Sequence, residues 1–240
     1  MSLRLYVDAA LQRDAVFDLP AAPARHVQVR RLQPGDRLCL FNGQGGEWAA
    51  TVLQMGRSQV RVRVDGFDAV ERELGVAVTV ALGMPANERM DILVEKATEL
   101  GAVAIVPLLC ERSVLRLAGD RAQRKREHWQ AIAAAAAEQC GRNRLPLLAA
   151  VQTLPAFLAQ LPARGLRLLL GPGAGAPTLA AVACGARQLL CLSGPEGGLS
   201  PAEESAALAH GFTRVQLGER ILRAETAPLA LLAWAGLEEA

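Results

Sequence analysis

Lysine, histidine and cysteine are scarce in this sequence of 240 residues, which contains two lysines, three histidines and five cysteines. The cysteines are odd in number and form no Cys-x-x-Cys pair, and three histidines offer no cluster at metal-ligand spacing. We therefore expect no metal site. Scattered cysteines of this kind are typical of buried thiols in a reducing compartment.

Long apolar runs are also missing. No uninterrupted apolar stretch reaches the length that spans a membrane, and the N-terminus lacks the basic and then apolar pattern of a signal peptide. No Ser-His-Asp or Cys-His constellation can be assembled from the motifs. These absences predict a cytoplasmic protein with no membrane contact and give no support to a triad-type hydrolase.

Excess charge of one sign is the third absence, because 26 basic and 24 acidic residues leave a formal net charge of +2. Such a balance neither requires nor excludes a nucleic-acid partner. Residues 112–144 are richer in positive charge, with eight basic residues against three acidic ones. Two interpretations stay open for this stretch: a solvated loop and helix face, or a surface that contacts phosphates.

The hydrophobic pattern divides the chain near residues 70–75. Before that point, alternating apolar residues such as Val60, Val62 and Val64 predict strands, and Pro34-Gly35-Asp36 and Asn42-Gly43 predict turns, so residues 1–72 are expected to form a small β-barrel. Residues 73–240 alternate between strand and helix patterns, which predicts an α/β domain with a mostly parallel sheet. Its expected strands are 76–82, 104–109, 166–170, 188–192 and 212–217, and its expected helices are 88–100, 127–139, 201–210 and 227–237.

The sharpest functional candidate is Ser193-Gly194-Pro195-Glu196-Gly197-Gly198-Leu199-Ser200, between a predicted strand and a helix that starts with a capping box. Its glycines allow close backbone approach to a ligand, and ligands bind beyond the carboxyl ends of parallel strands. An ordinary tight turn is the competing interpretation.

A second candidate also runs from a strand to a helix: Leu217-Gly218-Glu219-Arg220-Ile221-Leu222-Arg223-Ala224-Glu225-Thr226-Ala227. It places two arginines, two glutamates and a threonine at the carboxyl end of a strand. This segment alone fits two interpretations equally well: a binding loop, or a charged loop that faces solvent.

A third segment, Gly171-Pro172-Gly173-Ala174-Gly175-Ala176, formally matches the dinucleotide fingerprint G-x-G-x-x-A. It does not follow the first strand of the α/β region, and no acidic residue for a ribose follows a second strand unless Glu196 takes that role. A nucleotide-dependent oxidoreductase would depend on this segment, whereas a non-catalytic RNA-binding module would depend on the arginine surfaces. Both remain alternatives.

Four segments, taken in order along the chain, resemble one known family. They are Lys96-Ala97-Thr98-Glu99-Leu100-Gly101, Glu138-Gln139-Cys140-Gly141-Arg142, Gly194-Pro195-Glu196-Gly197-Gly198, and Leu217-Gly218 with Ile221-Leu222-Arg223-Ala224-Glu225-Thr226-Ala227. Residues 3–7 and 26–46 add to the likeness. The chain resembles the 16S ribosomal RNA uridine-N3 methyltransferases of the SPOUT superfamily over nearly its whole length. The glycine-rich segment 171–175 departs from the family pattern and puts the contacts of Leu170 and Gly171 in question.

The resemblance implies a C-terminal α/β domain with a deep trefoil knot and a small N-terminal PUA-like β-barrel that engages RNA. It also implies S-adenosylmethionine as methyl donor, 16S ribosomal RNA within the assembled small subunit as substrate, and a homodimer. The C-terminal helix supports the last point independently, because it is apolar on nearly every face and needs a cover.

The two strand-to-helix loops and the resemblance together give the expected site. The donor-binding residues are expected to be Leu170, Gly171, Leu192, Ser193, Gly194, Glu196, Gly197, Gly198, Leu217, Gly218, Ile221, Leu222, Arg223 and Thr226. Arg223 is expected to stabilise the anionic uracil and Glu225 to act as base, with Glu196 as the alternative base. The expected RNA contacts are Arg4, Arg25, Arg30, Arg31 and Arg142.

Overall fold

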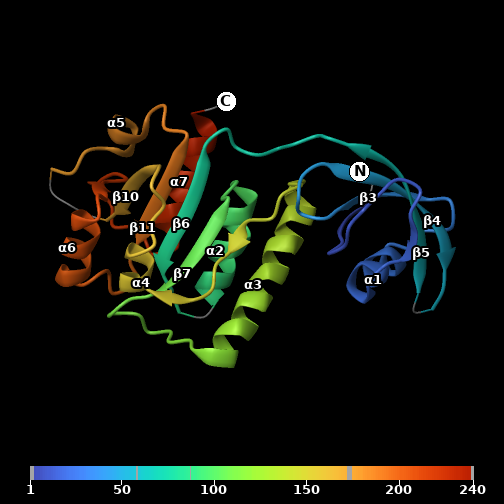
Figure 1. Cartoon of the computed structure of the whole chain (residues 1–240), viewed down its shortest axis with the longest axis horizontal. Coiled ribbons are helices and arrows are strands. Elements are labelled where there is room, and N and C mark those ends of the chain that lie inside the picture. The colour runs from blue at the N-terminus through green and yellow to red at the C-terminus, as the bar shows by residue number, and fades with distance from the viewer. Residues whose placement is uncertain (1–2, 58, 87, 172–174, 239–240) are drawn as a thin grey trace. The chain divides into compact units, whose positions relative to one another are not determined.

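A computed structural model of the chain describes residues 3–57, 59–86, 88–171 and 175–238 (Figure 1). The chain divides into two compact units. The first comprises Met1–Glu73 and Ala134–Leu145, and the second comprises Leu74–Ala133 and Pro146–Ala240. The sequence pattern placed a single boundary between residues 72 and 73; in the structure, the segment 134–145 groups with the N-terminal part of the chain.

The first unit is built on a five-stranded sheet with the order β1-β3-β4-β5-β2. Its strands are β1 (Leu3–Tyr6), β2 (Val16–Asp18), β3 (Arg37–Phe41), β4 (Glu47–Met55) and β5 (Val60–Asp68). Strand β1 pairs with β3 in parallel, and the other pairs are antiparallel. The alternation predicted for β5 is confirmed, because Val60, Val62 and Val64 are fully buried while Arg61 and Arg63 face solvent.

One helix of the first unit was missed by the sequence pattern, which reads residues 1–72 as β throughout. Helix α1 spans Ala21–Val29 and buries only Ala24 and Val27 against the sheet. Two buried residues three positions apart are too few to stand out as a helical period. The prolines at positions 20 and 23 lie at the start of this helix, where their missing N–H groups are tolerated.

Long-range hydrogen bonds tie residues 138–143 into the first unit. The backbone N–H of Tyr6 donates to Oε1 of Glu138 (2.7 Å), and Nη2 of Arg4 donates to Oδ1 of Asn143 (2.8 Å). Arg142 forms an ion pair with Glu73, and its side chain is only 4% exposed. This motif, Glu138-Gln139-Cys140-Gly141-Arg142, is therefore part of the framework of the first unit.

The second unit contains a seven-stranded sheet with the order β12-β10-β11-β6-β7-β8, in which β9 also pairs with β7. The strands are β6 (Ala77–Gly83), β7 (Ala104–Leu109), β8 (Leu147–Leu148), β9 (Gln152–Thr153), β10 (Leu166–Leu170), β11 (Gln188–Ser193) and β12 (Thr213–Val215). Every pairing is parallel. The predicted parallel α/β domain is thus confirmed, and Figure 1 shows its central strands side by side.

The helices after the first unit's sheet are α2 (Glu88–Glu99), α3 (Gly119–Cys140), α4 (Leu154–Leu158), α5 (Leu179–Ala183), α6 (Pro201–Ala209) and α7 (Thr226–Leu237). All belong to the second unit except the end of α3, which from Ala134 onward groups with the first unit. Two apolar cores lie on the sheet: one receives side chains from α2, α3, α5 and α7, the other from α4 and α6. Helix α3 begins earlier than expected from the sequence. Strand β12 is shorter than expected: it ends at Val215, and the N–H of Gln216 donates to the carbonyl of Pro177 (3.0 Å). Within the described ranges, no helix is long and apolar enough to cross a membrane.

Candidate functional site

A cavity of about 480 Å³ opens in the second unit where β10, β11 and β12 end. These are carboxyl ends of parallel strands, the edge at which open α/β sheets bind ligands, and the volume falls in the range of small-molecule sites. Both glycine-containing loops singled out in the sequence, after β11 and after β12, form its walls.

Most of the residues expected to bind the donor line this one cavity. They are Leu170, Gly171, Ser193, Gly194, Glu196, Gly197, Gly198, Leu217, Gly218, Ile221, Leu222 and Arg223. Two expected residues do not line it: Leu192 is fully buried in the sheet core, and Thr226 is the exposed first residue of α7. Among the polar lining residues, sequence reasoning missed Arg89 of α2, Glu204 of α6 and Gln216, which directly follows β12. Arg89 and Glu204 lie on helices and carry no local signal of a binding role.

The glycines of the two loops serve different purposes. At Gly198 (φ +69°) and Gly218 (φ +101°), a Cβ would meet no heavy atom within 4 Å, so the backbone faces open space that a ligand can occupy. At Gly194, by contrast, a Cβ would lie 2.7 Å from the backbone nitrogen of Leu199. Gly194 thus permits the tight turn, whereas Gly198 and Gly218 leave backbone accessible.

The loop after β11 is fixed at its far end by α6. Ser200 caps this helix, since its Oγ accepts from the N–H of Glu203 (3.2 Å), and a Glu203 carboxylate oxygen accepts from the N–H of Ser200 (2.9 Å). The predicted capping box is confirmed. Nη1 of Arg112 donates to the carbonyls of Gly197 (3.0 Å) and Leu199 (3.2 Å), which supports the same loop from outside.

Glu196 links this loop to the start of α2. Its Oε1 accepts hydrogen bonds from the backbone N–H of Ala86 (2.8 Å) and from Nη1 of Arg89 (3.2 Å). A carboxylate engaged by a backbone N–H and a guanidinium is oriented by them. These two contacts hold the Glu196 carboxylate against the start of α2.

Arg223 and Glu225 occupy different environments at the start of α7. The carbonyl of Arg223 accepts from the N–H groups of Thr226 (3.0 Å) and Ala227 (3.2 Å), so its backbone is held in a turn. Its side chain is exposed and forms no ion pair with the residues described. Glu225 is only 9% exposed and is not among the residues that line the cavity, and its Oε2 has no hydrogen-bond partner among the described residues.

The five arginines expected to contact RNA separate into two groups. Arg25, Arg30 and Arg31 are exposed on or just after α1. Arg4 and Arg142 are not free surface cations, because Arg4 pairs with Glu47 and Arg142 with Glu73 inside the first unit. The structure does not support the prediction that these two residues contact RNA, because both are framework groups whose charges are already compensated.

Three of the five cysteines, Cys39, Cys110 and Cys191, are buried thiols. Burial raises the pKa of the Cys39 thiol to about 11 and that of the Cys110 thiol to about 12, so both stay protonated at neutral pH. Cys191 is fully buried within β11, and burial raises its pKa to about 12 as well. In the part of the chain that the structure covers, no group of three or more His, Cys, Asp or Glu residues could hold a metal ion.

The chain is similar to known RNA methyltransferases in sequence. Residues 72–236 match the family described as RNA methyltransferase domain, and residues 20–65 match the RNA methyltransferase PUA domain. A Synechocystis protein named ribosomal RNA small subunit methyltransferase E is 37% identical over 97% of this chain and 77% of its own length. A Bacillus subtilis protein of the same name is 30% identical over 92% of this chain and 90% of its own length.

A solved structure is similar throughout. The crystal structure of a ribosomal RNA small subunit methyltransferase E from Neisseria gonorrhoeae, bound to S-adenosyl methionine, is 32% identical and superimposes with a TM-score of 0.92. The alignment covers 98% of this chain and 96% of that one.

Proposed function

The chain belongs to the RNA methyltransferase family, and we propose that it transfers the methyl group of S-adenosylmethionine to N3 of a uridine in 16S ribosomal RNA. The observation that carries this proposal is the cavity at the carboxyl ends of β10, β11 and β12, walled by two glycine-containing loops. The similarity to proteins named small subunit methyltransferases supports the choice of RNA. Localisation in the cytoplasm is part of the same proposal.

The cavity fits S-adenosylmethionine on the geometry of its own residues. The open backbone at Gly198 and Gly218 allows the donor to lie against main-chain groups, and the volume suits a molecule of that size. We assign donor binding to Leu170, Gly171, Ser193, Gly194, Glu196, Gly197, Gly198, Leu217, Gly218, Ile221, Leu222 and Arg223, which line the cavity. Leu192 lies in the apolar core beneath the cavity's sheet, and the N–H of Thr226 donates to the carbonyl of Arg223 (3.0 Å).

When bound, S-adenosylmethionine supplies an electrophilic methyl group on a sulfonium. The task of the protein is to align the uracil N3 with it and to stabilise the uracil once N3 has lost its proton. We assign the second task to Arg223, a residue that lines the cavity and whose side chain forms no ion pair with the residues described. Negative charge develops on the flanking uracil oxygens, and a fixed cation gains interaction as it develops.

We propose that Glu225 receives the N3 proton. Its Oε2 is a buried acceptor with no donor among the described residues, which costs free energy unless a donor arrives. The substrate N3–H is such a donor. Glu196 is less suited, since its Oε1 already accepts from Ala86 and Arg89.

A trefoil knot and a homodimer belong to the same proposal. Strand β12 lies outside β10 at one edge of the sheet, yet the chain then returns to α7, which packs on α2 and β11. This return supports the knotted path expected for the family. Helix α7 buries Leu231 and Leu232 within the unit but leaves Leu237 76% exposed, which supports a symmetric partner on its outer face.

The proposed function is tested by mass spectrometry of small-subunit ribosomal RNA from cells that lack the protein. We expect one uridine to lose its N3-methyl group and to regain it when purified protein and S-adenosylmethionine are added. Unchanged methylation in the deletion strain would contradict the proposal. Light scattering of the purified protein at micromolar concentration tests the dimer, and a monomer would contradict that part.

A further inference from the structure

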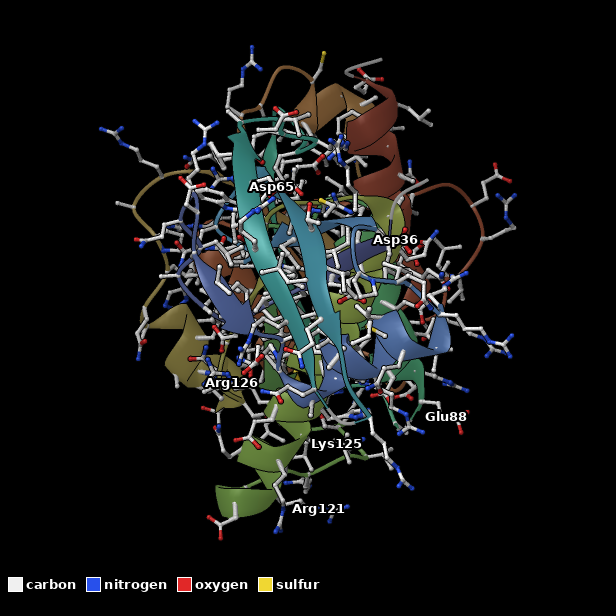
Figure 2. All side chains as sticks on the ribbon, turned by 90° about the vertical axis from the view of Figure 1, so that its right-hand side faces the viewer. Asp36, Asp65, Glu88, Arg121, Lys125 and Arg126 are labelled. Carbon is white, nitrogen blue, oxygen red and sulfur yellow. The ribbon has the colours of Figure 1, made fainter. Side chains whose placement is uncertain are left out.

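Positive charge is concentrated in the second unit where the loop after β7 leads into α3. Residues 111–128 contain six basic side chains against the three acidic ones of Glu111, Asp120 and Glu127. Figure 2 labels three of the basic residues, Arg121, Lys125 and Arg126, along the first turns of α3. The proposed mechanism makes no use of this segment.

The basic residues of α3 lie mainly on its outer face. Arg121, Arg124 and Lys125 are separated by three and four positions, which places them on one side of a helix, and Arg121 and Arg124 are exposed. Trp129 and Ala133, on the adjoining side of the helix, are buried in the core. The orientation of the helix is thus set by its apolar face, which leaves the arginines in solvent.

Four of these cations have no compensating carboxylate. Arg112, Arg116, Arg121 and Arg124 form no ion pair among the residues described, and we call these four the α3 arginine track. Arg112 and Arg116 donate only to backbone carbonyls, those of Gly197, Leu199 and Glu111. Most arginines on the strands of the first unit differ, since Arg4, Arg61 and Arg63 each pair with an acid.

The track begins at the wall of the proposed donor site. Nη1 of Arg112 contacts the carbonyls of Gly197 and Leu199, both of which line the cavity. The N–H of Glu111 donates to Oε1 of Glu203 on α6 (2.8 Å), which fixes the start of the same loop. A polyanion held on the track would therefore pass directly beside the cavity.

We propose that the α3 arginine track binds the phosphate backbone of the substrate RNA next to the nucleotide being methylated. Guanidinium groups present a planar fork that matches phosphate oxygens, and uncompensated cations release counterions when phosphates replace them. An acidic protein is the less suitable partner, because a protein interface has an apolar centre and Val114 is the main exposed apolar side chain in the loop. This inference rests on the proposed function, since it assumes an RNA substrate.

The test compares the double variant R121Q/R124Q with the control R164Q/R187Q in the full-length protein. Arg164 and Arg187 are also exposed and form no ion pair among the described residues, but they precede β10 and β11 at the opposite edge of the sheet. The two variants therefore lose the same charge. The probes are unmodified 16S ribosomal RNA made by transcription and small ribosomal subunits, each titrated at several KCl concentrations.

We expect R121Q/R124Q to bind RNA more weakly, with a plot of log affinity against log salt that is shallower by about 1.4 to 1.8 for two lost phosphate contacts. The control should match the wild type. Affinity for S-adenosylmethionine should be unchanged in both variants, since none of the four substituted residues lines the cavity. Single-turnover methylation should be unchanged in the control R164Q/R187Q.

Equal salt slopes for the two variants would overturn the inference. Weaker binding to subunits with an unchanged slope on naked RNA would also overturn it, in favour of a ribosomal protein as the partner. Failure of the proposed function is a separate result: the wild type would then transfer no methyl group to either probe, whatever the salt slopes.

Discussion

Oγ of Ser193, the last residue of β11, donates a hydrogen bond to the backbone carbonyl of Ala224 (3.3 Å), 31 residues further along the chain. Ser193 belongs to the first glycine-containing loop segment and Ala224 to the second. This bond therefore joins the two walls of the proposed donor site directly. Because Ser193 is only 4% exposed, water could not easily replace its hydroxyl as the donor to the Ala224 carbonyl if the hydroxyl were removed.

Replacing Ser193 by Ala should loosen the second wall. A hydrogen bond of this kind contributes about 0.5–1.5 kcal/mol, so we expect affinity for S-adenosylmethionine to fall by about 2-fold to 10-fold in calorimetry. Ser205→Ala is the matched control, since Ser205 is exposed on α6 and away from the cavity. Equal donor affinities for the two variants would show that the bond does not shape the site.

Replacing Gly198 by Val should abolish donor binding while leaving the fold intact. The side chain would fill open space over the backbone, and the left-handed φ of +69° would add local strain. Gly66→Val, in β5 of the first unit, is a control at a glycine where a Cβ also meets no neighbour. Calorimetry that returned wild-type donor affinity for Gly198→Val would argue strongly against the proposed site.

Replacing Arg223 by Ala should slow methyl transfer without preventing binding. Loss of one transition-state donor typically costs about 100-fold to 1000-fold in rate, and Arg223→Lys should rescue only in part because an ammonium lacks the planar fork. Single-turnover rates at saturating donor and RNA measure this. If donor affinity collapses and the rate of the bound complex survives, Arg223 is a binding residue instead.

Replacing Glu225 by Gln separates a base from a structural group. If Glu225 accepts the N3 proton, the variant should be slow near neutral pH and regain rate as the pH rises and the uracil loses that proton to water. A variant whose rate stays depressed at every pH would indicate that Glu225 only positions the start of α7. Far-ultraviolet circular dichroism should show that the fold is retained.

Replacing Arg142 by Ala should destabilise the protein far more than replacing its neighbour Arg144. The Arg142 side chain is 4% exposed and forms an ion pair with Glu73. Breaking a buried pair typically costs about 3–5 kcal/mol. Arg144 pairs with Glu71 at the surface (3.0 Å), a contact that is worth about 0–1 kcal/mol. Denaturant unfolding of both variants measures the difference, and equal midpoints would contradict it.

Much of the second unit was determined by local sequence, because its signals act over a few residues. The apolar run before Gly83 predicts a buried strand, Ser200 and Glu203 predict a helix start, and Gly101 with a φ of +92° ends a helix as expected. The family resemblance was confirmed by the matches to RNA methyltransferases. Residues 172–174 of the dinucleotide-like segment lie outside the described residues.

Only the tertiary structure decided which groups meet across long stretches of chain. Glu196 reaches Ala86 and Arg89, about a hundred residues earlier, and no local pattern indicates these two partners. Arg142 looked like an RNA contact in sequence, yet Glu73 and the first unit enclose it. Hydrophobic periods and turn residues report the local conformation of the backbone, whereas the compensation of a charge depends on side chains that only folding brings together.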